Sequence, residues 1–321
     1  MSAIIFGSFA YDNIMSFPDA FKKHILPDRI DQLNVCFMTP TMRREFGGCA
    51  GNISFNLKLL GSYPIPIGSV GKDFMPYDNW LEKHEISRQF LHVQQDIFTA
   101  QAFIITDIDE NQITVFHPGA MNFSHVNNAD NPLKKSTEIN IGIISPDGRD
   151  GMLQHATQLV TANIPFIFDP GQGLPMFSSE ELKNFIAQAN WIALNQYEWQ
   201  LLSQCTSMSI QEVTQQLQAL IITQGENGSV IHTSEQTYEI PIAKPKCVID
   251  PTGCGDAYRA GLLYGIMYDI DWQQTGQIAA LMGAINLEQH GTQNHTFTMD
   301  EFRTRYKENF SMTMPRSMSS K

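Results

Sequence analysis

The stretch of sequence that decides the fold reads DPTGCGDAYRAG, residues 250–261. Gly253 and Gly255 stand one residue apart in it, and glycine permits backbone conformations that turn successive N–H groups toward one point. The small residues over 257–263 predict that this turn opens a helix, whose first amides and dipole attract an anion. We therefore predict a phosphate-binding turn with the carboxylate of Asp256 beside it, placed to take a proton from an attacking hydroxyl.

Other interpretations of this turn depend on its spacing. A dinucleotide fingerprint fails because Tyr258 stands where the third glycine belongs. The nearest match to a Walker P-loop, GSVGKD at 68–73, has neither the spacing nor the hydroxyl of that motif. Cys254 finds no partner base in the sequence, so we expect its backbone amide to be used rather than its thiol. An ordinary helix start with a capping Thr or Asp remains the open alternative.

Length and charge limit the classes of protein. A chain of 321 residues buries a substantial core and favours one main domain with an appended piece. It has 33 acidic and 21 basic residues, a net charge of −12 and no basic run. Its five scattered cysteines do not form a disulfide pattern, and no apolar run reaches the length of a membrane span. We expect a soluble, cytoplasmic protein with neither nucleic acid nor a membrane as partner.

Short apolar runs alternate with segments of helical periodicity, as at 151–163 and 178–190. The apolar runs are typical of buried parallel strands: 4–6, 141–144, 166–168, 191–194 and 220–222. This alternation predicts an α/β fold with a doubly wound, mostly parallel sheet, whose ligands bind at the carboxyl ends of the strands. We assign residues 1–310 to this domain and expect the tail, 311–321, to be disordered.

Two segments break the alternation, 34–45 and 100–117. In the second, two apolar strands flank a polar turn at 107–111, which is a hairpin pattern. Inserted into an α/β domain, with boundaries near 10–45 and 98–120, such strands form a small β-sheet lid; an ordinary extra sheet edge is the alternative. Exposed lid strands also give a physical motive for a homodimer formed through the lid.

A glycine pair marks a second candidate site. Residues 47–52 read GGCAGN and precede a segment of helical pattern that Gly61 is suited to end. Paired glycines let a polyol lie against the backbone, while Asn52 and the distant Asp12 offer hydrogen bonds to adjacent hydroxyls. Helix capping by Asn52 and a turn at Asp12 are the alternatives.

Two patterns that follow predicted strands suit a nucleotide. Asn195 and Glu198 come directly after the strand at 191–194, and one carboxylate with neighbouring polar groups can steer a nucleotide-bound Mg²⁺. The first turn of a helix is an equal alternative for Glu198. Residues 223–228 read TQGENG and either pass close to a nucleotide's phosphates or ribose, or form only a hairpin turn.

Taken together, these residues resemble the PfkB family of carbohydrate and nucleoside kinases, also called the ribokinase-like family. The resemblance covers nearly the whole chain and rests on the glycine pair at 47–52, the phosphate turn at 250–256, and Asn195 with Glu198 between them. Within the family the chain is most similar to bacterial adenosine kinases. That similarity rests on five short segments: 17–18, 116–121, 197–199, 256–261 and 291–293.

The resemblance implies an α/β core with a β-lid, and transfer of the ATP γ-phosphoryl group to a primary hydroxyl with Asp256 as general base. The anion hole would be formed by amides of Gly253, Cys254 and Gly255. The ribose would be held or approached by Ser8, Asp12, Gly48, Asn52 and Gln172. The nucleotide would be bound by Asn195, Thr223, Gly225, Gly228 and Asn286. Glu198 would reach Mg²⁺ through water, and Asn286 alternatively lies near a monovalent cation such as K⁺.

The reaction expected from this resemblance is ATP-dependent phosphorylation of the 5'-hydroxyl of adenosine to give AMP. Phe103 and Phe116, one on each predicted lid strand, are expected to stack on the nucleobase; core packing is the alternative. Two other functions remain open. A ribokinase-like sugar kinase would use the same ribose-holding residues, and a catalytically idle nucleoside-binding module would need the pocket but not Asp256.

Overall fold

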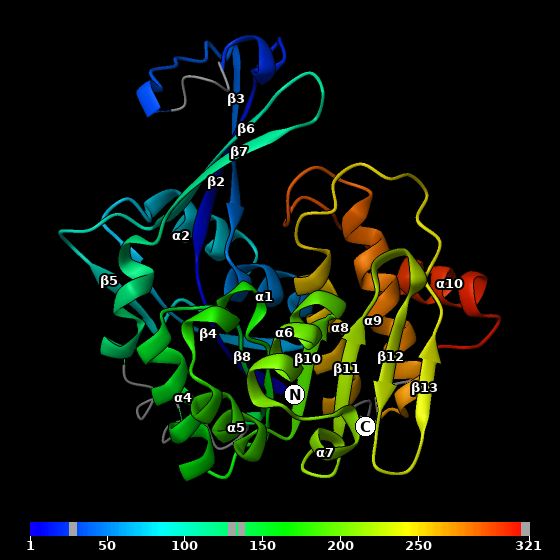
Figure 1. The fold of residues 1–321 in the computed structure, drawn as a ribbon. Helices are drawn as coiled ribbons and strands as arrows, with labels where there is room; N and C mark the ends of the chain where they lie inside the picture. Colours follow the sequence, from blue (N-terminus) through cyan, green and yellow to red (C-terminus); the bar gives the residue numbers. More distant parts are fainter. Residues whose placement is uncertain (26–30, 128–132, 134–138, 316–321) are drawn as a thin grey trace.

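The apolar runs of the sequence form neighbouring strands of one large sheet in the computed structural model, which describes residues 1–25, 31–127, 133 and 139–315. Within the described residues, nine strands lie in the order β13-β12-β11-β10-β9-β8-β1-β4-β5 (Figure 1). Their bounds are β1 (Ser2–Phe6), β4 (Tyr63–Gly71), β5 (Leu91–Gln94), β8 (Ile139–Ile144), β9 (Phe166–Phe168), β10 (Trp191–Asn195), β11 (Ala219–Thr223), β12 (Ser229–His232) and β13 (Thr237–Ile240). Strands from β11 to β5 run parallel, and β12 and β13 are added antiparallel. The predicted doubly wound, mostly parallel sheet is confirmed.

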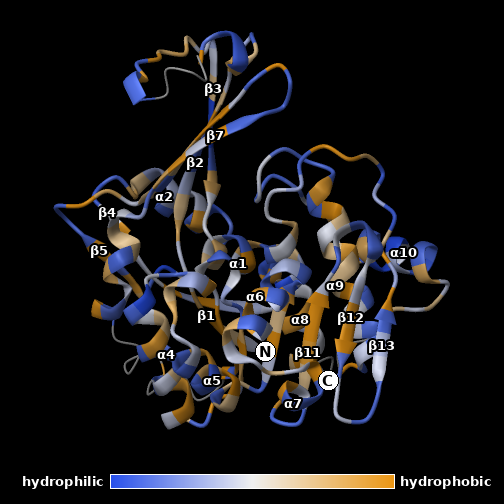
Figure 2. Cartoon of the chain, in the orientation of Figure 1, coloured by the Kyte–Doolittle hydropathy of each residue, from blue (hydrophilic) through white to orange (hydrophobic). Residues whose placement is uncertain are grey.

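Helices cover both faces of this sheet because its strands are apolar on both sides. In β1, Ala3 and Ile5 pack into one core while Ile4 and Phe6 pack into the other. The first core is covered by α1 (Cys49–Leu59), α2 (Met75–Lys83), α8 (Cys254–Met267), α9 (Trp272–Leu287) and α10 (Met299–Phe310). The second is covered by α4 (Arg149–Thr161), α5 (Ser179–Gln188), α6 (Gln196–Thr206) and α7 (Ile210–Thr214). The hydrophobic colour of β11 in Figure 2 reflects this burial between two helix layers.

A second sheet of four strands in the described chain projects from the core and forms the lid (Figure 1). Its order is β3-β2-β6-β7, with bounds β2 (Ala10–Ser16), β3 (Thr41–Gly47), β6 (Ala100–Thr106) and β7 (Gln112–His117). β6 and β7 pair antiparallel, so the hairpin predicted at 100–117 is confirmed. A short 3₁₀ helix, η1 (Phe21–Lys23), follows β2. Within the predicted lid boundary of 10–45, residues 26–30 lie outside the described residues.

Connections beyond the strand ends bring the remaining parts of the site into place. Three of them are 3₁₀ helices: η3 (Gly119–Val126), η4 (Gly171–Met176) and η5 (Gly225–Asn227). The start of the tail predicted to be disordered, 311–315, belongs to the described part, where Met314 is only 3% exposed and packs into the first core. The rest of that tail, 316–321, lies outside the described residues. In the described chain, no helix combines the length and the apolar character needed to cross a membrane.

Candidate active site

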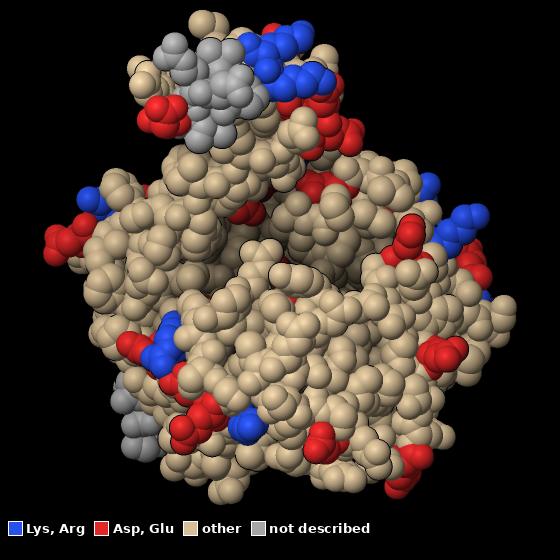
Figure 3. All heavy atoms as spheres, in the orientation of Figure 1, with Lys and Arg blue, Asp and Glu red and all other residues tan. Residues whose placement is uncertain are grey.

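A cleft of about 610 Å³ lies where the lid meets the carboxyl ends of the large sheet. Figure 3 shows the hollow beneath the lid, with acidic side chains on its rim and within it. Most residues predicted for the site line this cleft: Ser8, Asp12, Gly48, Asn52, Phe116, Gln172, Asn195, Glu198, Thr223, Gly253, Gly255 and Asp256. Other predicted residues are absent from its lining in the described part of the chain: Phe103, Cys254, Gly225, Gly228 and Asn286.

The predicted phosphate turn is the start of helix α8. Gly253 is its N-cap residue with φ 80° and ψ −2°, a left-handed conformation that favours glycine. A Cβ on Gly253 would lie 2.7 Å from Cγ2 of Thr292, so the position also lacks space for a side chain. Gly255 and Asp256 belong to the first turn, where N–H groups have no carbonyl one turn earlier in the helix. The Cys254 N–H instead donates to the Pro251 carbonyl at 3.2 Å, so this amide of the expected anion hole is already engaged.

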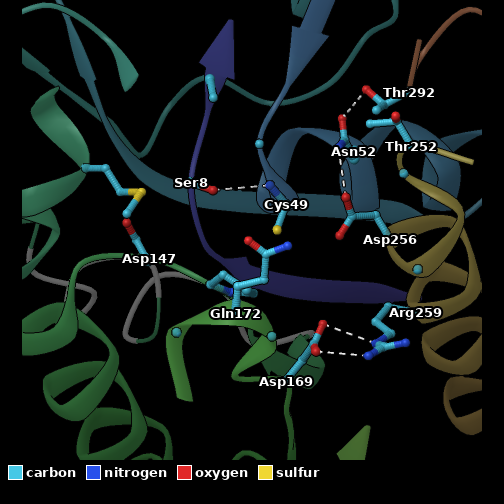
Figure 4. A pocket seen from close by; sticks show the side chains of 18 of the residues that line it. Ser8, Cys49, Asn52, Asp147, Asp169, Gln172, Thr252, Asp256, Arg259 and Thr292 are labelled. Carbon is cyan, nitrogen blue, oxygen red and sulfur yellow. Dashed lines mark hydrogen bonds and ion pairs between the residues drawn. The ribbon is translucent and has the colours of Figure 1, made fainter. Parts of the chain in front are cut away.

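The Asp256 carboxylate lies on the cleft side of this turn. Its Oδ2 accepts a hydrogen bond of 2.8 Å from Nδ2 of Asn52 (Figure 4). Burial raises the pKa of Asp256 to about 7, and the nearby Asp169 carboxylate adds to the rise, while the Asn52 hydrogen bond opposes it. A carboxyl group with a pKa near neutrality suits a general base, because a substantial part of it is ionised at neutral pH and it is still basic enough to take a proton.

Asn52 is held by a network that the sequence did not reveal. Its Oδ1 accepts hydrogen bonds from Oγ1 of Thr292 at 2.6 Å and from Nε2 of Gln293 at 2.9 Å. Gln293 also donates to the Tyr77 hydroxyl and accepts from the Trp80 indole N–H. Asn52 was predicted to hold ribose hydroxyls; in the structure its Nδ2–H group donates a hydrogen bond to Asp256. The network therefore fixes the orientation of the candidate base.

The glycine pair allows the lid to pack tightly onto the core at the point where β2 and β3 join it. Gly48, the N-cap of α1, has φ 86°, and a Cβ there would lie 2.5 Å from the Ser8 carbonyl oxygen. A Cβ on Gly47 would lie 2.4 Å from Oδ2 of Asp12. The Ser8 hydroxyl accepts the Cys49 N–H at 3.2 Å and so ties β1 to α1. This packing places Asp12 among the residues that line the cleft.

Asp12 is one of several carboxylates near the point where the lid joins the core. Its pKa is raised to about 6, mainly by burial and in addition by the negative charges of Glu45 and Asp250. Nη2 of Arg43 lies 3.4 Å from Oδ2 of Asp250, and its Nη1 lies 3.7 Å from Oε1 of Glu45. Among the described ion pairs, none includes Asp12. An ionised carboxylate in this position is a strong acceptor for hydroxyl groups.

On the opposite side of the cleft, Asn195 and Glu198 form the start of α6. The Asn195 side chain accepts the Glu198 N–H, and Oε2 of Glu198 accepts the Asn195 N–H at 2.7 Å. This capping box is the helix alternative weighed from the sequence. Both residues still line the cleft, and burial raises the pKa of Glu198.

The TQGENG segment forms a turn between antiparallel strands. Thr223 ends β11 and lines the cleft, whereas Gly225 and Gly228 belong to the turn that leads into β12. Gly228 has φ 86°, and a Cβ there would lie 2.2 Å from the Ile240 carbonyl oxygen. Gly225 also has a positive φ, 59°, so the backbone of the β11–β12 connection favours glycine at both positions.

Asn286 supports the phosphate turn from behind, whereas Arg259 and Asp169 line the cleft itself. Nδ2 of Asn286, on α9, donates to the Thr252 carbonyl at 2.7 Å, so Asn286 holds the turn rather than facing the cleft. Arg259 and Asp169 form a buried ion pair through two hydrogen bonds of 3.1 Å (Figure 4). Sequence reasoning missed this pair, although Asp169 follows a predicted strand and Arg259 comes three residues after Asp256.

The two lid aromatics lie on different faces of the lid. Phe116 pairs with Ala102, which pairs with Asp12, and residues opposite one another in a sheet share a face. Phe103 pairs with Val115 and Asn13 and therefore points to the other face. Of the two, only Phe116 is brought to the cleft.

Comparison with known proteins agrees with this geometry. The model described as pfkB family carbohydrate kinase matches residues 26–298. A nucleoside kinase of Methanocaldococcus jannaschii is 33% identical over 276 residues, which are 85% of this chain and 89% of that protein. The structure of a Burkholderia thailandensis nucleoside kinase in complex with inosine has a TM-score of 0.87 and 46% identity, covering 97% of this chain and 99% of that chain. Its complex with ADP-inosine has a TM-score of 0.86 and 46% identity over 99% of both chains. The chain therefore belongs to the PfkB family of carbohydrate kinases and is a kinase.

Proposed function

We propose that the protein transfers the γ-phosphoryl group of ATP to the 5'-hydroxyl of a purine nucleoside, and that adenosine is a substrate, giving AMP. The observation that carries this proposal is that Asp256, Asp12 and Phe116 line one cleft. Asp256 as a base suits the hydroxyl on the 5'-carbon of a nucleoside. Asp12 as a hydrogen-bond acceptor suits the ribose hydroxyls, and the Phe116 ring suits the nucleobase. The inosine complex of the Burkholderia thailandensis nucleoside kinase supports the purine nucleoside class.

In the proposed reaction, Asp256 accepts the 5'-hydroxyl proton while the hydroxyl oxygen forms a bond to the γ-phosphorus. The bond from that phosphorus to the bridging oxygen of the β-phosphate breaks, and ADP leaves with the electron pair. First-turn amides of α8 and the turn at Gly253 stabilise the charge on the transferring group. Because Asn52 already orients Asp256, the base needs no rearrangement when substrate arrives.

Mg²⁺ fits this cleft as a partner of the nucleotide. Among the described residues, no group of three or more His, Cys, Asp or Glu side chains is arranged to hold a metal. Mg²⁺ keeps several waters and takes few protein oxygens where phosphates share it, so the single carboxylate of Glu198 is sufficient through water. Bound Mg²⁺ would neutralise phosphate charge.

The buried Oδ1 of Asn286 has no hydrogen-bond partner in the described chain, and we propose it as the oxygen nearest to a monovalent cation such as K⁺.

A substrate panel tests the proposal directly. Initial rates of ADP formation with Mg-ATP are measured against adenosine, inosine, a pyrimidine nucleoside, ribose and fructose. We expect purine nucleosides to be used best. A sugar kinase remains the second candidate because Asp12 and Gly48 would contact only the ribose part; turnover of sugars alone would establish it. Binding of nucleosides without any ADP formation would indicate an idle binding module.

Activity should depend on pH through Asp256. Its raised pKa of about 7 means that the carboxyl group is protonated, and unable to accept the hydroxyl proton, below that pH. We expect kcat/KM to rise about tenfold per pH unit up to about pH 7 and then to level off. Initial rates at subsaturating nucleoside check this, and a level profile between about pH 5 and 8 would contradict the assigned role.

The two lid phenylalanines offer a matched pair of variants. Phe116→Ala should weaken nucleoside binding by about tenfold, because the cleft-facing ring is lost, whereas Phe103→Ala should leave the nucleoside Kd nearly unchanged. Calorimetric titration with adenosine measures both. Equal losses in the two variants would show that the lid orientation seen here is not the one that binds the nucleoside.

We also propose that the lid forms a homodimer through the face opposite the cleft. Phe103 and Val115 share that face and are 38% and 61% exposed. Apolar side chains exposed on a sheet favour association. Sedimentation at micromolar concentration should give a dimer for the wild type and a monomer for Val115→Glu; a monomeric wild type would contradict this proposal.

A further inference from the structure

One buried carboxyl group in the cleft has no part in the reaction described above. Asp147 lies in the connection between β8 and α4, where the sequence reads SPDG at 145–148. It is 2% exposed, yet it lines the same cleft as Asp256. Figure 4 shows the two carboxyl groups on opposite sides of the pocket. Asp147 is therefore far from the phosphate turn but still within reach of a bound molecule.

Only half of this carboxyl group is used within the protein. Oδ1 of Asp147 accepts the Gly148 N–H at 2.9 Å. Oδ2 is buried and has no hydrogen-bond partner in the described part of the chain. A buried polar atom without a partner costs free energy, so its retention calls for a partner that arrives from outside.

The surroundings supply no cation to Asp147. Burial raises the pKa of Asp147 to about 8, so the group carries a proton at neutral pH. Arg149, two residues on, directs its guanidinium to Asp150, Glu181 and the Met176 carbonyl. Among the described elements beside Asp147, η3 carries the titratable side chain His125, η4 carries none, and α4 carries Arg149, Asp150 and His155, whose Nδ1 faces Gln158. A neutral carboxyl group offers one O–H donor and one acceptor side by side.

The walls beside Asp147 are apolar and adaptable. A Cβ on Gly171 would lie 2.5 Å from Cγ of Pro146, and one on Gly148 would lie 2.5 Å from the Met121 carbonyl, so η4 and η3 both pack against this connection. These helices contribute Met121 and Met176 to the cleft lining. Methionine packs against flat rings of different outline, which suits the side of a nucleobase.

We propose that Asp147 is a specificity-determining residue that hydrogen bonds the edge of the purine base where a ring nitrogen stands next to the 6-substituent. Its O–H donates to the ring nitrogen of adenosine, and its carbonyl oxygen accepts from the 6-amino group. The inference rests on the proposed nucleoside function and extends it to the base. A divalent cation is a poorer match, because Asp147 belongs to no group of three or more described His, Cys, Asp or Glu side chains that could hold a metal ion.

Two substrates and two variants test this assignment. Purine riboside lacks the 6-amino group of adenosine, so the wild type should prefer adenosine by about tenfold in kcat/KM. Asp147→Leu removes both polar atoms and should lower kcat/KM for adenosine by about 10–100-fold while abolishing that preference. Asp147→Asn keeps one donor and one acceptor and should retain most of both. Asp150→Leu, on the exposed first turn of α4, is the matched control and should change neither.

The pH dependence of kcat/KM provides a second measurement that needs only the conservative variant. Above about pH 8 the wild-type carboxyl group ionises and loses the O–H that donates to the ring nitrogen, which adenosine and purine riboside share, so kcat/KM for both nucleosides should fall, whereas kcat/KM of Asp147→Asn should stay level. If the wild type phosphorylates nucleosides and the Asp147→Leu variant still prefers adenosine to purine riboside, this inference alone is overturned. A wild type that phosphorylates no nucleoside would overturn the proposed function, and this inference with it.

Discussion

Asp256→Asn should lower kcat by about 10²–10⁴-fold while leaving the Kd for nucleoside within about twofold of the wild type. Asn keeps the shape of the side chain and can still accept the Asn52 hydrogen bond, but it cannot take the hydroxyl proton. Pre-steady-state and steady-state ADP formation measure the loss, and calorimetry measures binding.

The stability of this variant separates a chemical defect from a folding defect. The Asp256 carboxylate is held in a buried setting that raises its pKa, so replacing it by a neutral amide should not lower the melting temperature. Asp300→Asn, whose carboxylate is largely exposed on α10, serves as the control and should retain full activity. A near-wild-type kcat in Asp256→Asn would remove Asp256 from the role of general base.

Gly253→Ala should lower kcat/KM by at least about 10²-fold, the loss typical when an anion-hole donor is displaced. The new Cβ would press on Thr292, whose hydroxyl bonds Asn52, so both the phosphate turn and the alignment of the base would shift. ADP formation at low nucleoside and low ATP measures the effect.

Gly61→Ala is a matched control for backbone strain. Gly61 has φ 81°, against 80° for Gly253, but a Cβ there would meet nothing within 4 Å. Both substitutions therefore carry a similar left-handed penalty of about 1–2 kcal/mol, and only the one at Gly253 disturbs the cleft. We expect Gly61→Ala to lose stability and keep its kcat/KM. Equal kcat/KM for the two variants would contradict the assignment of the turn.

The central strands were predictable because each is a continuous apolar run buried on both faces. β4 was not, since Pro64 and Pro66 argue against a strand. The structure explains how they are tolerated. The backbone N–H of Tyr63 donates to the Met1 carbonyl beside β1. The backbone nitrogens of the alternate residues 64 and 66 therefore lie on the side of β5, where pairing starts only at Gly68. The missing N–H groups therefore face no strand.

The sequence identified residues of the site more readily than their partners. Asn52 and Gln293 are 241 positions apart, and no local pattern relates them. The opposite orientation of Phe103 and Phe116 follows from the hairpin register, and a shift by one residue would have reversed it. Asp147 follows a predicted strand, yet only the fold reveals that its Oδ2 lacks a partner beside the cleft.

The central claim is that a nucleoside 5'-hydroxyl accepts the phosphoryl group of ATP with the help of Asp256. The most direct measurement compares ADP formation by the wild-type protein with adenosine and with 5'-deoxyadenosine, which lacks only the acceptor hydroxyl. We predict steady ADP formation with adenosine and only the rate seen without nucleoside with 5'-deoxyadenosine. Equal ADP formation with both, or none with adenosine, would contradict the account.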